Sequence, residues 1–212
     1  MRSTTNIIAS DEGFSLTEMM VVSILVAIIL AAAWMASATV TTAADGMISR
    51  SQAQTEGQQA LELMTREIRQ GEIITDAAGV NYTIKTPFSP TSITFYADVD
   101  HDGLPERVTY NLTTAGLLQR SLARTTVVFP GPTDYGADSA AKTLAHMTPG
   151  TANLFTYWDG GDPALSTTDP TTVSAVQVTM NTVARSGGSN VTVTFQPTLV
   201  QVRAYSDVFT PW

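Results

Sequence analysis

Residues 13–40 read GFSLTEMMVVSILVAIILAAAWMASATV, and this stretch decides the architecture of the chain. No charged side chain occurs between Glu18 and Asp45, and the twenty-two residues from Met19 to Val40 are nearly all apolar. A helix of that length rises roughly 33 Å, which matches a hydrocarbon core of about 30 Å. The sequence therefore predicts a single transmembrane helix near the N-terminus, with the rest of the chain outside the membrane.

The start of this run differs from a secretory signal peptide cleaved near residues 36–38. The apolar region is longer than the roughly 7–15 residues that are usual in a signal peptide, and it is preceded by Asp11 and Glu12 instead of a basic cluster. An uncleaved signal anchor remains as an alternative. Neither alternative explains Glu18, because a carboxylate within the membrane costs about 2.5–3.5 kcal/mol on insertion scales and normally has a partner.

The sequence GFSLTE at residues 13–18, joined directly to the apolar helix, resembles the N-terminus of type IV pilin-like proteins. The resemblance implies that a prepilin peptidase and methyltransferase cuts between Gly13 and Phe14 and methylates the new amine of Phe14. It also implies that Glu18 is an assembly residue, which neutralises the Phe14 amine of another subunit. In a medium of low dielectric constant such a pair fixes the axial register between the helices of two subunits, since either charge alone is costly.

The sequence predicts four segments and an α+β fold: a long N-terminal helix packed on an antiparallel β-sheet domain. The segments are a prepilin leader at 1–13, a transmembrane or filament-core helix at 14–40, an amphipathic helical continuation at 41–71, and an extracytoplasmic β domain at 72–212.

The continuation at 41–71 contains no proline, and its apolar residues recur with the period of a helix. Gly71 stands where a C-terminal cap is expected. The side chains predicted to pack are Ala53, Ala60, Leu61, Met64 and Ile68. Those predicted to lie elsewhere on the helix include Glu62, Arg66, Glu67 and Arg69.

Beyond Gly71 the pattern becomes alternating and rich in Thr and Val, which is typical of strands. Residues 137–147, ADSAAKTLAHM, instead predict a short helix, with His146 packed at its edge. The predicted strands are Tyr82–Lys85, Ser92–Tyr96, Arg107–Leu112, Leu117–Leu122, Thr126–Phe129, Phe155–Trp158, Val173–Val183, Val191–Gln196 and Leu199–Tyr205.

Within the pilin-like class, the chain resembles minor pilins of the PilW type and J-type pseudopilins of type II secretion. The resemblance rests on the order of residues 58–69 (QQALELMTREIR), 93–110 (ITFYADVDHDGLPERVTY), 155–157 and a closing hairpin up to Arg203. This resemblance implies a low-abundance subunit that starts or tips a pilus or pseudopilus. The implied partners are the prepilin peptidase, other pilins or pseudopilins, an inner-membrane assembly platform, and membrane lipid before assembly. A major, shaft-forming pilin is the alternative within the class.

A loop between two predicted strands carries alternating acids, Asp98, Asp100 and Asp102, followed by Gly103. This is the first half of an EF-hand-type calcium loop, in which oxygen ligands converge on a tight turn. Glu106, at the ninth position, is a fourth candidate ligand. The twelfth position is Thr109 instead of the bidentate Glu, so an acidic hairpin turn is the alternative to a calcium site.

The composition of the chain disfavours several classes of function. A net charge of −8 disfavours nucleic-acid binding, and the absence of Cys removes disulfides and thiolate chemistry. With two His and no nucleophile motif, enzymatic activity is not expected. The alternative to a filament subunit is a membrane-anchored extracytoplasmic binding or adhesion domain with a calcium loop, in which Glu18 has no special role.

Overall fold

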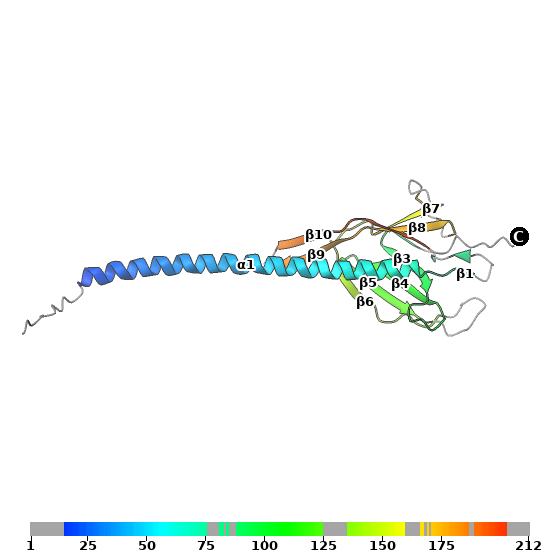
Figure 1. Cartoon of the computed structure of the whole chain (residues 1–212), viewed down its shortest axis with the longest axis horizontal. Helices are drawn as coiled ribbons and strands as arrows, with labels where there is room; N and C mark the ends of the chain where they lie inside the picture. Colours follow the sequence, from blue (N-terminus) through cyan, green and yellow to red (C-terminus); the bar gives the residue numbers. More distant parts are fainter. Residues whose placement is uncertain are drawn as a thin grey trace, which may run out of the picture. The chain divides into compact units, whose positions relative to one another are not determined.

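The computed structural model forms two compact units, Met1–Asp45 and Gly46–Trp212, which are described separately. One long helix runs from the first unit into the second, and the other elements of the described part of the second unit are antiparallel strands (Figure 1). The fold is therefore α+β, as the sequence predicts. The structure describes residues 15–75, 81–82, 84, 88–124, 135–159, 166–167, 169, 171–186 and 189–202.

The helix α1 spans Leu16–Arg69. It begins after Ser15, whose carbonyl accepts hydrogen bonds from the backbone N–H groups of Glu18 at 3.0 Å and Met19 at 3.2 Å. Serine is a favoured residue at this N-cap position. At the other end the helix stops at Arg69, two residues before the predicted capping glycine. The Gly71 N–H donates to the Ile68 carbonyl at 3.1 Å, but Gly71 does not have the positive φ of a glycine cap.

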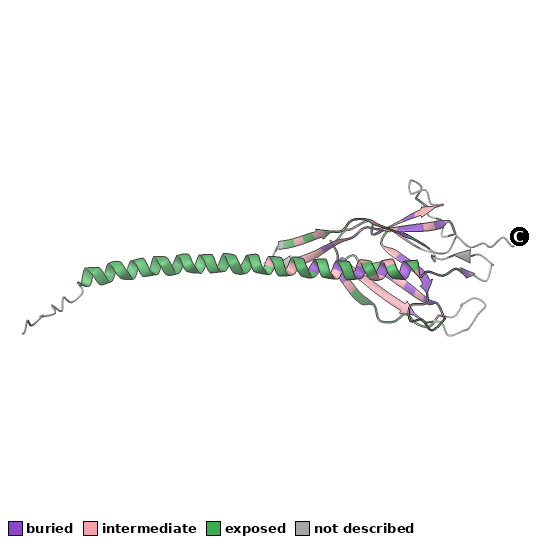
Figure 2. Ribbon diagram, in the orientation of Figure 1, coloured by how far each residue is buried: buried purple, intermediate pink, exposed green. Residues whose placement is uncertain are grey.

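The two parts of α1 differ in burial. Every described residue of the first unit is exposed, and the most apolar window of the helix has no buried residue. Figure 2 shows the change, with buried positions beginning at Ala53. Within the described residues, α1 is the one helix long and apolar enough to cross a membrane. Its exposed apolar surface is that of a segment surrounded by lipid or by other apolar helices.

The strands of the second unit pair antiparallel in four small sheets. The largest has the order β3-β4-β5-β6 and is a meander of consecutive strands. A second has the order β11-β8-β7, and the hairpins β1-β2 and β9-β10 form the other two. The bounds are β1 Ile74–Thr75, β2 Asn81–Tyr82, β3 Ser92–Ala97, β4 Glu106–Leu112, β5 Leu117–Ala123, β6 Lys142–His146, β7 Phe155–Asp159, β8 Val173–Val178, β9 Asn181–Ser186, β10 Ser189–Thr194 and β11 Thr198–Gln201.

Two of the predicted elements are wrong. The expected helix at 137–147 is absent: residues 142–146 form strand β6, which pairs with β5 from Leu117 to Arg120, and residues 137–141 form neither helix nor strand. Cross-strand pairing overrides the local preference of these residues for helix. The expected single strand Val173–Val183 is divided between β8 and β9, which belong to different sheets. The chain changes partner at Thr179, whose N–H donates to the Leu154 carbonyl at 2.9 Å. The strand predicted at Thr126–Phe129 lies outside the described residues.

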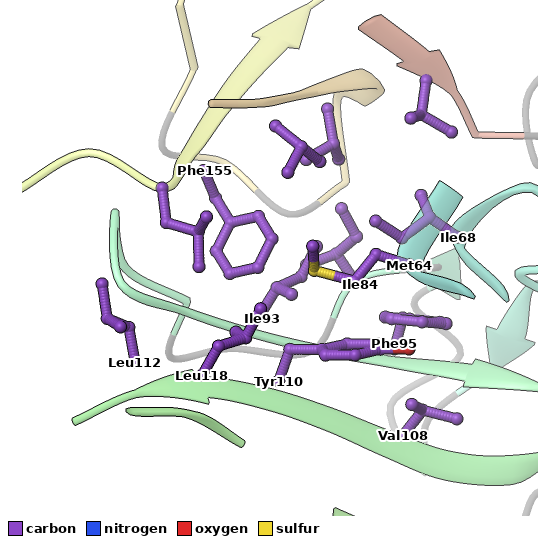
Figure 3. Close-up of a cluster of buried hydrophobic side chains, with 14 of the residues drawn as sticks. Met64, Ile68, Ile84, Ile93, Phe95, Val108, Tyr110, Leu112, Leu118 and Phe155 are labelled. Atoms are coloured by element: carbon purple, nitrogen blue, oxygen red, sulfur yellow. The ribbon is translucent and has the colours of Figure 1, made fainter. Parts of the chain in front are cut away.

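One apolar core joins the second half of α1 to both larger sheets. Met64 and Ile68 of α1 lie beside Phe95, Tyr110 and Phe155, which come from β3, β4 and β7 (Figure 3). All five side chains have relative exposures of 2% or less. The predicted packing face is confirmed for Ala53, Ala60, Met64 and Ile68, and Leu61 packs at its margin.

Glu67 was predicted to lie off this face, and that prediction is wrong: its relative exposure is 3%. Arg120 of β5 donates to the Glu67 carboxylate twice, from Nε to Oε2 at 3.0 Å and from Nη2 to Oε1 at 2.8 Å. The Tyr110 hydroxyl of β4 donates to Oε2 at 2.5 Å. Burial and the Glu67 charge raise the pKa of Tyr110, so this hydroxyl keeps its proton.

A second contact places the β9-β10 hairpin against α1. The Thr182 hydroxyl of β9 donates to the Ala53 carbonyl at 3.0 Å and is fully buried. A Cβ at Gly57, one turn further along α1, would collide with the Phe195 ring and lie 2.9 Å from Thr182 Cγ2. Glycine at this position therefore allows the helix and the hairpin to approach closely.

The Glu67 cluster gives a stability prediction. Glu67→Ala leaves the Arg120 guanidinium partly buried and unpaired, so we expect the free energy of unfolding to fall by about 3–5 kcal/mol. The measurement is denaturant unfolding of the full chain in detergent, followed by tryptophan fluorescence. Glu62→Ala, an exposed change on the same helix, should cost less than about 0.5 kcal/mol. Equal midpoints for the two variants would contradict the prediction.

Candidate functional site

The N-terminal site is described from Ser15 onward, so Gly13 and Phe14 lie outside the described residues. Glu18 is exposed in the first turn of α1, three residues after the N-cap Ser15. Its negative charge is favourable there, because the unpaired N–H groups give a helix N-terminus a partial positive charge. In the described part of the chain Glu18 forms no ion pair, so the carboxylate is available to a group from another molecule.

The acidic loop lies between β3 and β4. Carboxylate oxygens of Asp98, Asp100 and Glu106 all lie within 4.8 Å of one another. Asp102, the remaining predicted ligand, lies outside this trio: its carboxylate accepts a hydrogen bond from the Leu104 N–H at 2.9 Å. The structure therefore brings together three of the four predicted calcium ligands.

Hydrogen bonds within the loop also support the alternative of an acidic turn. The Asp98 carboxylate accepts from the N–H groups of Asp102 at 3.1 Å and Gly103 at 3.0 Å. His101 has φ of 63° and Gly103 has φ of 86°, so the backbone turns through the left-handed region. The Arg124 guanidinium lies 2.9 Å from Oδ2 of Asp100 and partly offsets the negative charge. Calcium binding at this loop stays a prediction.

Glu106 is the buried member of the trio, with a relative exposure of 1%. Burial raises the pKa of its carboxyl group, and the charges of Asp100, Asp102 and Asp98 raise it further. The Val99 N–H donates to Oε2 at 2.9 Å and opposes this shift. The loop therefore holds a carboxylate whose charge is costly unless a proton or a cation compensates it.

The comparisons with known proteins bear on the N-terminal site. Residues 8–34 match the prokaryotic N-terminal methylation motif. Neither a curated protein nor a solved structure matches the chain. The motif supports a type IV pilin-like protein that is processed by prepilin peptidase, and together with the exposed apolar helix it supports anchoring in a membrane. The matched range contains the predicted processing residues Gly13 and Phe14 and the predicted assembly residue Glu18.

Two polar contacts were missed by the sequence analysis. Glu67 falls on the helical period of Ala60 and Met64, so its position could have identified it as buried, but its partners Tyr110 and Arg120 could not be identified from spacing. His146 was expected at a helix edge. It is instead exposed on β6, with Nδ1 3.4 Å from Oε2 of Glu56, because residues 142–146 form a strand.

The raised pKa of Glu106 predicts a pH-dependent stability. The folded state binds a proton here more readily than the unfolded chain, so stability falls as pH rises from the ordinary glutamate pKa through the raised value. Glu106→Gln keeps an acceptor for Val99 and removes the charge. We expect this variant to melt above the unaltered chain at about pH 7.5 and level with it near pH 4. The measurement is circular dichroism, with Glu62→Gln as the exposed control. A lower melting temperature at pH 7.5 would contradict the argument.

The calcium prediction has its own test. Ca²⁺ prefers several oxygen ligands, and the carboxylates of Asp98, Asp100 and Glu106 supply them. Millimolar CaCl₂ should therefore raise the melting temperature of the full chain, and MgCl₂ should do so less because Mg²⁺ requires a stricter geometry. Asp100→Asn should remove the calcium effect, whereas Asp45→Asn, outside the loop, should keep it. An identical response of the two variants would favour the acidic turn.

Proposed function

We propose that this chain is a minor pilin or pseudopilin: a structural subunit that is cleaved after Gly13, methylated on Phe14, and assembled through α1 into a type IV pilus or a type II secretion pseudopilus. The observation that carries the proposal is the methylation motif at residues 8–34, which includes the start of the exposed apolar part of α1.

Charge balance supports the role given to Glu18. Cleavage before Phe14 would create an amine close to the level of the membrane, where an unpaired charge is costly. Glu18 is exposed and has no ion-pair partner in the described part of its own chain. A second subunit that offers its Phe14 amine would satisfy both charges and would align the two helices at one register.

The two units would have different roles. The exposed apolar helix would remain in lipid until it packs against the helices of other subunits, with the inner-membrane assembly platform and the peptidase as earlier partners. The β domain would lie outside the cytoplasm and would give the subunit its place in the filament. The second candidate is a tethered extracytoplasmic binding or adhesion domain, favoured by the three carboxylates that meet in the acidic loop.

The first test is the N-terminal mass of the full chain, purified from membranes of cells that also express a prepilin peptidase. Peptide fragmentation should locate Phe14 as the first residue, with one added methyl group. Gly13→Leu should leave the leader attached, because a side chain there obstructs approach of the peptidase to the backbone. A retained leader in the unaltered chain would favour the tethered domain, and a start near Ala38 would show a cleaved signal peptide.

The second test separates assembly from anchoring. Glu18→Ala removes the proposed partner of the Phe14 amine, so we expect at least a tenfold loss of the subunit from sheared filaments, measured by immunoblot, while the amount in the membrane is unchanged. Thr17→Ala, at the neighbouring position, serves as the matched control. Normal incorporation of Glu18→Ala would show that the carboxylate does not direct assembly.

A further inference from the structure

Few charged side chains occur on the part of α1 that precedes its contacts with the β domain. From Leu16 to Gln52 they are Glu18, Asp45 and Arg50, and all three are exposed. Asp45 and Arg50 form no ion pair within the described part of the chain. Asp45 follows Glu18 by 27 residues, a rise of about 40 Å along a helix, which exceeds the hydrocarbon thickness of about 30 Å. Two opposite charges therefore stand beyond the apolar segment.

Asp45 and Arg50 cannot compensate each other within one helix. Their separation of five residues turns the helix by about 140°, so the two side chains leave it on different sides. Neighbours on a helix surface are instead three or four residues apart, and no residue at that distance from Asp45 or Arg50 is charged. In a single chain both charges are left to solvent, and a counter-charge would have to come from another molecule.

The helical period assigns the three charges to two faces of α1. Glu18 and Asp45 are 27 residues apart, about seven and a half turns, so the period places them on opposite faces. Arg50 is 32 residues from Glu18, about nine turns, so the period returns it to the face of Glu18. The chain between Glu18 and Arg50 is helical throughout. By this period, one face carries Glu18 and Arg50, and the opposite face carries Asp45.

The pairing proposed at Glu18 also sets an axial offset between two copies of the chain. Phe14 precedes Glu18 by four residues, so a copy whose Phe14 amine meets Glu18 of the next copy is displaced from it by about 6 Å. The same offset brings Asp45 of the first copy level with residue 49 of the next, one residue from Arg50. The remaining difference of about 1.5 Å is small beside the length of an Arg side chain. One offset therefore serves both charge pairs.

The two faces complement each other at this offset. The copy that offers its Phe14 amine can turn its Asp45 face toward its neighbour, because an amine at the end of a helix leaves rotation about the helix axis free. The neighbour presents Glu18 and Arg50 on the facing side. We infer that Asp45 of one copy forms an ion pair with Arg50 of a second copy of this chain. The inference rests on the proposed function and extends it by naming the partner, so it requires at least two copies in the filament.

Such a contact has the properties that a filament needs. Because it joins two different faces of the helix, it can repeat from copy to copy without closing. It also provides attraction between chains that each carry a net charge of −8 and otherwise repel. With the pair at Glu18, the offset is specified at two levels about 40 Å apart along the helix, so a slipped neighbour would lose both pairs.

The test uses charge reversal in two copies of the full chain, one with a FLAG tag and one with a His tag at the C-terminus. Both are expressed with a prepilin peptidase, extracted in a mild detergent and purified by the His tag, and the FLAG-tagged copy is measured by immunoblot. Asp45→Lys in both copies, or Arg50→Glu in both, should lower copurification about tenfold, because like charges then meet at the contact. Lys142→Glu on β6 makes the same charge change as Arg50→Glu and should have no effect.

The decisive sample combines Asp45→Lys in one copy with Arg50→Glu in the other. Opposite charges then meet wherever unlike copies are neighbours, so copurification should be restored, which a folding defect in either variant would not allow. The inference is overturned if the unaltered copies do not copurify, if the reversals have no effect, or if the mixed copies associate as weakly as either variant alone. The N-terminal mass of the same samples separates the two proposals: methylated Phe14 as the first residue leaves the proposed function standing, and a retained leader overturns both.

Discussion

The buried carboxylate of Glu67 is the contact on which the arrangement of the second unit depends. It accepts hydrogen bonds from Arg120 on β5 and from Tyr110 on β4, so one side chain of α1 is joined to two adjacent strands of the largest sheet. Apolar contacts are not directional, so they specify the position of the helix on the sheet less sharply than a hydrogen-bonded ion pair does. A buried ion pair adds little net stability, but it penalises every register in which one charge remains unpaired. Glu67 therefore specifies the position of α1 on the sheet together with the buried side chains of Met64 and Ile68.

The same helix meets two different requirements along its length. Its first part leaves apolar side chains exposed, and such a surface is stable only in lipid or against other apolar helices. Its second part places small residues against the strands: Ala53 accepts a hydrogen bond from Thr182, and Gly57 lets the β9-β10 hairpin approach. The helix thus carries both the surface proposed for assembly and the surface that holds the β domain. The acidic loop lies on the β domain, so it can vary without altering the surface proposed for assembly.

Local signals predicted those elements in which one physical cause dominates. The uncharged run from Met19 to Val40 predicts a helix because unsatisfied backbone groups are excluded from hydrocarbon, and β3, β4 and β5 follow from alternation bounded by turn residues. Prediction of secondary structure failed where contacts between residues far apart in the chain decided which element forms. Residues 142–146 have a sequence suited to helix but form β6 against β5, and the break at Thr179 depends on a hydrogen bond to the distant Leu154.

By itself the sequence determined the long apolar helix, the methylation motif with Gly13, Phe14 and Glu18, and the α+β class, because each of these depends on the order and chemistry of neighbouring residues. It also placed the acids of the acidic loop on one turn. Only the tertiary structure decided that Asp98, Asp100 and Glu106 converge while Asp102 does not, and that Glu67 is buried. These features depend on strand register and on contacts between residues far apart in the chain, and no local pattern of residues encodes either.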